Sequence, residues 1–530
     1  MSAAPAPRTP TTTTLAAGAD LGLYAADDFR ITDGRCSDCP TIRQALWYFE
    51  RETIAVAKDG RPVARFVRGL RFDEDLRAWL AARSEHAQLE LPPLVWIAAP
   101  DLLSGTRLTG DLTGLVSGIG PLSFALTPKI PLNRSYFDQS SARFFVGRDL
   151  KVRGTVKNGA IVARTLWPED FRFAVAPPVL PSTDDESPTL ALRRRMRAER
   201  NGGGATSPYA VETLWQRAGS NADLRGRAVL AFMINGAQGD DDEAHAGHFA
   251  LVTGRVQSDG AIGDWLVNNF YTLDAESEKG IIAAPVPLDN YLADLNAGQN
   301  WYRPSYMLVA VLSSGRAPTL VQSALGRVYN QFYRHQIVYY HPTTNCTSIS
   351  VDTLRALGWD VPARGPTSRL AAWAGFPLLV LKERSLAKAK VGFDYLCADQ
   401  TRLLPAAAAE EIFGSLLALG TQDRATAHAG GPLSQMLAHD LDALVFVRFP
   451  QFPSSRAWGD APVVTAWEYR MRFPPDPAMA QIVPVPPRPF PDALRDADLL
   501  RPARPPSDAG ALTWGIALIA AFAWALWRLW

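Results

Sequence analysis

The sequence predicts a mixed α+β protein with a β-rich N-terminal domain, a larger α+β domain and a single C-terminal transmembrane helix. Residues 20–180 contain segments in which apolar and polar residues alternate around turn signals such as Lys157-Asn158-Gly159, a pattern typical of antiparallel hairpins. Between residues 209 and 473, apolar runs with the length of strands alternate with helical stretches. Residues 511–527 form an uncharged, Trp-rich run.

The amino-acid composition narrows the classes of protein to which this chain can belong. The chain has 530 residues, enough for several domains at about 150 residues each. Its 54 Lys and Arg residues balance 53 Asp and Glu residues, which argues against a protein dominated by nucleic-acid binding. Four Cys in this length exclude a disulfide-based scaffold. Function must therefore reside in specific residues.

Changes in composition set the expected boundaries. Residues 1–18 are rich in Pro, Thr and Ala, lack the apolar core of a secretory signal and are expected to be disordered. The remaining expected segments are a β-rich domain (19–180), a linker (181–208), an α+β domain (209–473), a Pro-rich linker (474–510) and a membrane anchor (511–530).

The anchor prediction rests on length and aromatic content. Seventeen uncharged residues reach roughly 25 Å as a helix, close to the thickness of a thin bilayer. A buried terminal helix is the alternative. Three arginines precede the run and one follows it, which favours an inner-membrane, tail-anchored protein with its large part in the cytoplasm: Arg495, Arg501 and Arg504 against Arg528.

Cys36 and Cys39 form a C-x-x-C motif with two interpretations. A structural zinc needs four ligands, and the other two cysteines lie more than 300 residues away. We therefore interpret the pair as two thiols or an incidental disulfide.

Cys346 is the predicted nucleophile. The segment Asn345-Cys346-Thr347 opens a helix that Thr344 or Asn345 can cap and that Gly358 ends. Unpaired backbone N–H groups and the helix dipole stabilise a thiolate at such a position, and the same groups can bind an oxyanion.

His248 is the predicted base, because it begins an apolar strand after a loop that could line a cleft. If this strand and the next form a hairpin around residues 257–260, His248 faces Asn269, which would orient the imidazole. A register slip of one residue would bring Asn268 to this position instead.

Neighbouring residues complete the expected pocket. Tyr340 and His341 lie on the approach to the helix and, with Tyr339, are expected to shape the pocket; Asn345 and Thr347 are expected to contribute to binding at its start. A metal site is the weaker alternative. It would use the acidic loop at residues 240–243 with His245 and His248, but a solvated acidic loop is the more usual arrangement. No metal or cofactor is expected.

Three short segments together resemble a known family. They are Gly247-His248-Phe249-Ala250-Leu251, Val267-Asn268-Asn269-Phe270 and Asn345-Cys346-Thr347. Their order resembles the Lnb N-terminal periplasmic domain family, with a circularly permuted papain-like fold in which His precedes Cys. The resemblance covers residues 225–360, about a quarter of the chain.

The resemblance implies a cysteine hydrolase or acyltransferase. Its substrate would be an ester, amide or thioester, acyl- or peptide-like, with lipid-linked substrates included. Relatives usually lie outside the inner membrane, so the periplasm is the alternative compartment. A catalytically inactive, membrane-tethered scaffold is the alternative function.

Overall fold

The computed structural model describes residues 20–58, 64–67, 69–84, 87–111, 113–126, 139–174, 188–197, 209–221, 223–236, 247–273, 282–295, 303, 305–422, 430–451 and 489–495. The segment expected to be disordered (1–18), the predicted anchor (511–530) and most of the Pro-rich linker lie outside these ranges. Within them, no helix combines the length and apolar character needed to cross a bilayer.

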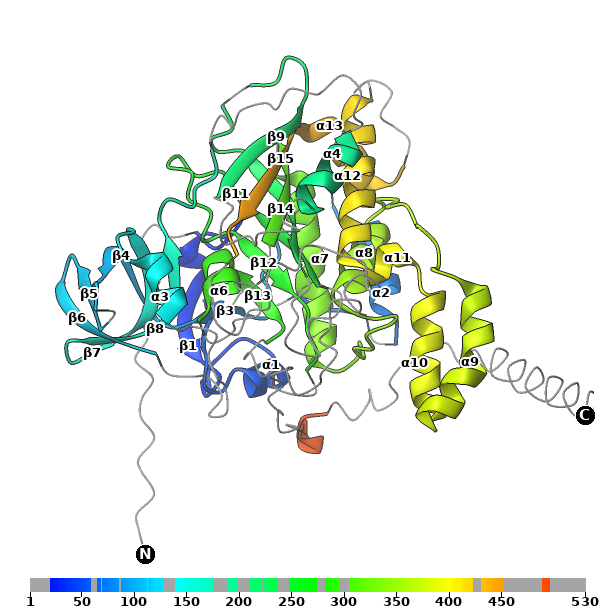
Figure 1. The fold of residues 1–530 in the computed structure, drawn as a ribbon, viewed down its shortest axis with the longest axis horizontal. Helices are drawn as coiled ribbons and strands as arrows, with labels where there is room; N and C mark the ends of the chain where they lie inside the picture. The colour runs from blue at the N-terminus through cyan, green and yellow to red at the C-terminus, as the bar shows by residue number, and fades with distance from the viewer. Residues whose placement is uncertain are drawn as a thin grey trace, which may run out of the picture.

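A seven-stranded antiparallel sheet forms the centre of the fold, which confirms the mixed α+β class (Figure 1). The strand order is β13-β12-β11-β10-β14-β15-β9. In chain order the strands are β9 (Ala210–Gln216), β10 (Ala228–Asn235), β11 (His248–Arg255), β12 (Leu266–Asn269), β13 (Ala284–Pro287), β14 (Ser305–Leu312) and β15 (Leu441–Phe449). β10 and β14 are buried along their whole length, because elements cover both faces of the sheet.

Long helices cover one face of this sheet. Gln322 bonds to Thr253 and Asn268, and Trp359 packs edge-on against Phe232. The helices that pack around this face are α2 (Phe72–Ala82), α7 (Arg316–Tyr333), α8 (Cys346–Ala356), α12 (Pro405–Thr421) and α13 (Pro432–Asp440). Gly358 follows α8 with φ +87°, and a Cβ there would lie 2.7 Å from Pro432, so only glycine permits this close approach of α13.

The opposite face meets α6 (Leu288–Ala293). Successive strand residues point to opposite faces, so Asn235 lies on the other side from the helix-facing Phe232. Tyr291 of α6 bonds to Asn235 on that side. One end of the sheet therefore carries polar groups between the strands and α6.

The N-terminal region forms two separate β units. The first is a three-stranded sheet of β1 (Phe29–Asp33), β2 (Thr53–Ala57) and β3 (Val95–Ala98), and β3 packs against β13. The second is a closed barrel of β4 (Asp101–Leu108), β5 (Gly114–Ser117), β6 (Gly120–Ala125), β7 (Leu150–Lys157) and β8 (Ala160–Pro168). η1 (Ala26–Asp28), α1 (Arg43–Tyr48) and α3 (Gln139–Phe145) accompany them.

Local sequence explains the β7–β8 turn. Asn158 and Gly159 have φ values of +52° and +73°, the left-handed pair that a tight hairpin between twisted strands requires. One continuous core joins residues of α1, the barrel and the central sheet, so the N-terminal β units pack directly against the larger α+β part.

Part of the expected linker is also structured. Pro188–Arg197 form α4, whose Leu192 and Met196 are buried and whose Arg193 pairs with Glu410 of α12 at 2.8 Å. Its apolar residues at helical spacing drive this part of the segment onto the body.

The remaining described helices lie towards the C-terminal half. α9 (Arg369–Glu383) and α10 (Leu386–Cys397) form an antiparallel hairpin that projects from the body beside α11 (Gln400–Leu403) (Figure 1). The last short turn is η5 (Asp492–Leu494).

Candidate active site

Cys346 is the first residue of α8. The Asn345 side chain caps the helix by accepting from the N–H groups of Thr347 and Ser348, both at 2.9 Å. Ser348 completes a reciprocal box, since its Oγ accepts from the Asn345 N–H at 2.8 Å. This double cap fixes the position of the thiol, which is 6% exposed.

His248 begins β11 and is held by Asn269. The His248 Nε2 lies 2.7 Å from the Asn269 Oδ1. The Asn269 Nδ2 donates to the carbonyl of Ile282 at 3.2 Å, which directs the amide oxygen towards the imidazole. An amide oxygen only accepts, so Nε2 carries the proton and Nδ1 remains available to take a proton from the thiol.

The hairpin register differs from the sequence prediction by two residues. Asn269 was expected opposite His248, but Leu251 pairs with Asn268, which places Asn269 across from Ala250. The connection is longer than a tight turn, since the pairing ends at Thr253 and Leu266, and Ala261 in this connection forms a β-bridge with Arg172. A slip of two preserves the face of every side chain, so Asn269 still reaches His248 diagonally.

The alternative residue, Asn268, faces the opposite side of the sheet. Its side chain bonds to Gln322 of α7 at 2.9 Å and to the Leu251 carbonyl at 3.3 Å. It therefore ties strand β12 to α7 and does not contact the imidazole.

The surroundings favour a thiolate at Cys346. Burial alone would raise the pKa of this thiol, but the charge and hydrogen bond of His248, the Phe249 backbone N–H and Thr347 lower it to about 7 from an ordinary value of 9.0. The thiol therefore lies at the end of β11, within the reach of His248. An imidazolium–thiolate pair is the chemistry expected of a cysteine nucleophile.

Tyr339 adds a hydroxyl beside the thiol. Burial raises its pKa well above the ordinary value, and the nearby Cys346 thiolate raises it further, whereas the Cys346 backbone N–H lowers it. The phenol therefore stays protonated and lies next to that N–H group. Sequence reasoning assigned Tyr339 only a part in shaping the pocket.

A polar chain that sequence reasoning missed runs across the same end of the sheet. Tyr291 donates to the Asn235 Oδ1 at 2.5 Å, and the Asn235 Nδ2 donates to Ser305 at 2.8 Å. Burial raises the pKa of Tyr291 well above the ordinary value, the Cys346 thiolate adds to this, and Arg303 opposes it. A polar Asn that ends the otherwise apolar run AVLAFMIN was the available signal.

Arg303 is buried at this end of the sheet. It is fully shielded from solvent, and none of its three guanidinium nitrogens has a hydrogen-bond partner in the structure as described. A buried charge without a partner is costly, so this position suits a bound anionic group.

The four predicted binding residues have different surroundings. Asn345 is the helix cap, and its Nδ2 also donates to the His341 carbonyl at 2.7 Å. The Thr347 hydroxyl lies 3.8 Å from the Cys346 sulfur. Tyr340 donates to Asp394 of α10 at 2.8 Å, and His341 bonds to Tyr395. Tyr340 and His341 therefore connect the loop before the thiol to α10.

The metal alternative gains no support from the described part of the chain. There, no group of three His, Cys, Asp or Glu side chains is arranged to hold an ion. The acidic loop at residues 240–243 and His245 lie outside the described residues.

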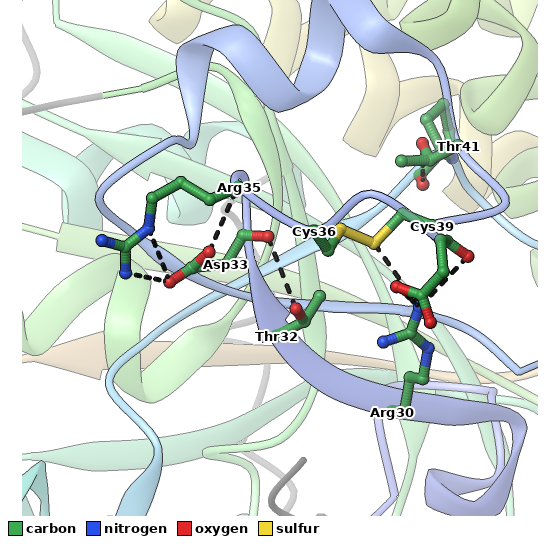
Figure 2. The surroundings of a disulfide bond; sticks show 9 residues. Arg30, Thr32, Asp33, Arg35, Cys36, Cys39 and Thr41 are labelled. Carbon is green, nitrogen blue, oxygen red and sulfur yellow. Dashed lines mark hydrogen bonds and ion pairs between the residues drawn. A yellow bond between two sulfur atoms is a disulfide. The ribbon is translucent and has the colours of Figure 1, made fainter. Parts of the chain in front are cut away.

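Cys36 and Cys39 form a disulfide in the loop between β1 and α1 (Figure 2). Arg30 lies beside it and pairs with Asp38 at 3.0 Å. The pair is thus a local disulfide cross-link. The sequence left open whether these residues are two thiols or a disulfide.

Comparisons with protein-family models, with curated proteins and with solved structures found no match to this chain. The functional argument consequently rests on the residues themselves.

Proposed function

We propose that the chain is a membrane-tethered cysteine hydrolase or acyltransferase of the permuted papain-like type. The observation that carries the proposal is that Asn269 bonds to His248 at 2.7 Å, while His248, with help from the Phe249 N–H and Thr347, lowers the pKa of Cys346 to about 7. A helix start, a base and an orienting amide are the parts that thiol acyl-transfer chemistry needs.

In the proposed reaction the Cys346 thiolate attacks the carbonyl of an ester, amide or thioester. His248, protonated by the thiol, then gives its proton to the leaving group as the tetrahedral intermediate collapses. Water, or an acceptor amine or hydroxyl, is deprotonated by His248 and releases the acyl group from Cys346. Every proton is exchanged through Nδ1, since Asn269 holds Nε2.

The oxyanion requires donors that are not already used. Asn345 occupies the N–H groups of Thr347 and Ser348, so these cannot also bind substrate. We assign the oxyanion to the Tyr339 hydroxyl beside the thiol; the Cys346 N–H contacts the Tyr339 oxygen and would have to exchange that contact for the oxyanion. One such donor contributes about 3–4 kcal/mol in other enzymes.

The buried Arg303 guanidinium supports the proposal that the substrate is anionic. The guanidinium acts electrostatically on Tyr291, as the Cys346 thiolate also does, so the charge lies at the same end of the sheet as the thiol. A lipid-linked acyl donor with a phosphate would supply the missing counter-charge. Arg303→Met should therefore slow turnover of a phospholipid more than turnover of a neutral thioester.

A thiol probe tests the central proposal. Iodoacetamide at neutral pH should label Cys346 rapidly in the intact protein, and Cys346→Ala should abolish both labelling and turnover. Cys397 is the internal control, because burial raises its pKa and Cys397→Ala should leave the rapid labelling unchanged.

The second candidate function is an inactive scaffold. It is favoured by the burial of the reacting groups, since Cys346 is 6% and His248 4% exposed. Slow labelling of Cys346, equal to that of Cys397, would support the scaffold and contradict the enzyme.

A further inference from the structure

The hairpin of α9 and α10 carries an apolar stripe on its outer side. Leu370, Leu378 and Leu381 are 81%, 67% and 75% exposed. Their spacing of eight and three residues places them within an arc of about 80° at 100° per residue, and the exposed Ala374 falls in the same arc. An ordinary surface helix would present polar residues on this face.

The stripe does not belong to the core of the hairpin. Trp373 and Phe376 pack against Phe393 across the two helices, with ring centroids 4.9 Å and 5.9 Å apart. The Leu379 side chain packs closely against Gly392 of α10. The inner face is therefore already filled, and the leucines of the outer face are left for another partner.

Basic residues surround the stripe. Residues 369–397 contain five Lys or Arg and two Asp or Glu. Lys382, Arg384 and Lys388 gather at the tip between the helices, next to Leu386, which is 65% exposed. Leucines flanked by Lys and Arg are the composition of helices that lie in a membrane interface, where the basic side chains meet anionic headgroups.

We infer that the outer face of the α9–α10 hairpin rests in the interface of an anionic lipid bilayer. Charge complementarity favours a bilayer over an apolar protein groove. The uncharged run near the C-terminus is consistent with contact between the hairpin and a bilayer. Fifteen residues separate Arg495, where the described chain ends, from the uncharged run at 511–527, and extended they reach about 50 Å. The run can therefore enter the same bilayer that the hairpin touches.

The hairpin also contacts the loop that leads to the thiol. Asp394 accepts from Tyr340, and Tyr395 bonds to His341, five residues before Cys346. Lys390 lies over the Tyr340 ring, 6.0 Å from its centroid. A membrane contact on this hairpin would hold the Cys346 site close to lipid.

The first test uses the full chain in vesicles of phosphatidylcholine with phosphatidylglycerol. An environment-sensitive fluorophore is attached at Leu378→Cys or, as matched control, at Ile119→Cys on the barrel, where the native side chain is also 67% exposed. Cys346→Ala and Cys397→Ala remove competing thiols. A blue-shifted emission at position 378 alone is expected. Equal, water-like emission at both positions would overturn the inference.

The second test separates the hairpin from the C-terminal run. A chain that ends at Pro506 should float with vesicles containing phosphatidylglycerol and less with pure phosphatidylcholine. Leu378→Asp with Leu381→Asp should weaken this binding roughly tenfold or more, whereas Ile119→Asp should not.

Loss of all vesicle binding in the truncated chain would contradict the inference and assign the stripe to the C-terminal run or to a protein. Unchanged Cys346 labelling would show that the Asp variants are folded. Vesicle binding does not depend on Cys346, so a failure of the proposed chemistry and a failure of this inference remain distinguishable.

Discussion

At the scale of single residues, the chemistry depends on the balance at Cys346 between burial, which opposes a thiolate, and His248, which favours it. Since the pKa is lowered to about 7, the thiolate predominates above that pH and is lost below it. The iodoacetamide rate should therefore rise with pH around 7. His248→Ala should move this rise upwards by one pH unit or more, because it removes the largest of the effects that lower the pKa of Cys346 and leaves burial opposed only by the Phe249 N–H and Thr347. An unchanged pH profile in His248→Ala would contradict the pairing.

The two neighbouring asparagines should behave differently. Asn269→Ala should lower kcat by about 10- to 100-fold with little change in KM, because it frees the imidazole to rotate. Asn268→Ala should leave kcat nearly unchanged but cost about 1–3 kcal/mol of unfolding free energy, because Gln322 loses its buried partner. Steady-state kinetics and urea unfolding of both variants check this. Reversed effects would assign the orienting role to Asn268.

The nucleophile and base should act as a unit. Cys346→Ala and His248→Ala should each lower kcat/KM by about a thousandfold or more, and the double variant should lose little beyond either one. Additive losses in the kinetic cycle would mean that the two residues serve separate steps.

At the scale of elements, one buried and one partly buried ion pair dock the barrel onto α6 and the residue that follows it. Arg153 of β7 pairs with Asp289 at 2.8 Å, and Arg164 of β8 pairs with Asp294 at 2.8 Å. Because α6 also carries Tyr291, these pairs position one wall of the candidate site. The barrel thus contributes to the site without supplying a reacting group.

Breaking one of these pairs should be costly. Arg153→Ala leaves Asp289 buried without its cation and should lower the unfolding free energy by about 3–5 kcal/mol. Arg107→Ala is the matched control on the barrel, because Arg107 and Asp149 are 61% and 51% exposed and such a pair contributes little. Denaturant unfolding of both variants measures this difference. Equally small losses of unfolding free energy in the two variants would mean that the buried pair is not needed for docking.

At the scale of the whole molecule, two features of the chain indicate different cellular compartments for its large part. The excess of arginines before the C-terminal run favours the cytoplasm for the large part. The Cys36–Cys39 disulfide favours an oxidising compartment, the periplasmic alternative. We give the disulfide more weight, because the arginine count rests on very few charges.

Alkylation in intact cells tests the compartment. If cells are quenched with acid and the denatured protein is treated with a maleimide-linked polymer, two cysteines, Cys346 and Cys397, should react before reduction and all four after it. Four adducts without reduction would place the large part in the cytoplasm.

The sequence by itself determined the features that depend on local chemistry. Strand and helix periodicity predicted the α+β class, Asn158-Gly159 predicted the β7–β8 turn, and the Asn345-Cys346-Thr347 segment predicted a capped helix with a thiol at its start. His248 and Asn269 were found because strand alternation survives a register error of two residues.

Features that depend on contacts between residues far apart in the sequence were decided only by the tertiary structure. Tyr291, Asn235 and Ser305 form a chain of hydrogen bonds because α6 and β14 are brought to the end of β10, which no local pattern reveals. The two β units and α4 share the main core because their apolar faces can be buried only against the central sheet. Burial of apolar surface is non-directional, so local patterns specify which faces must be covered, and the fold alone determines what covers them.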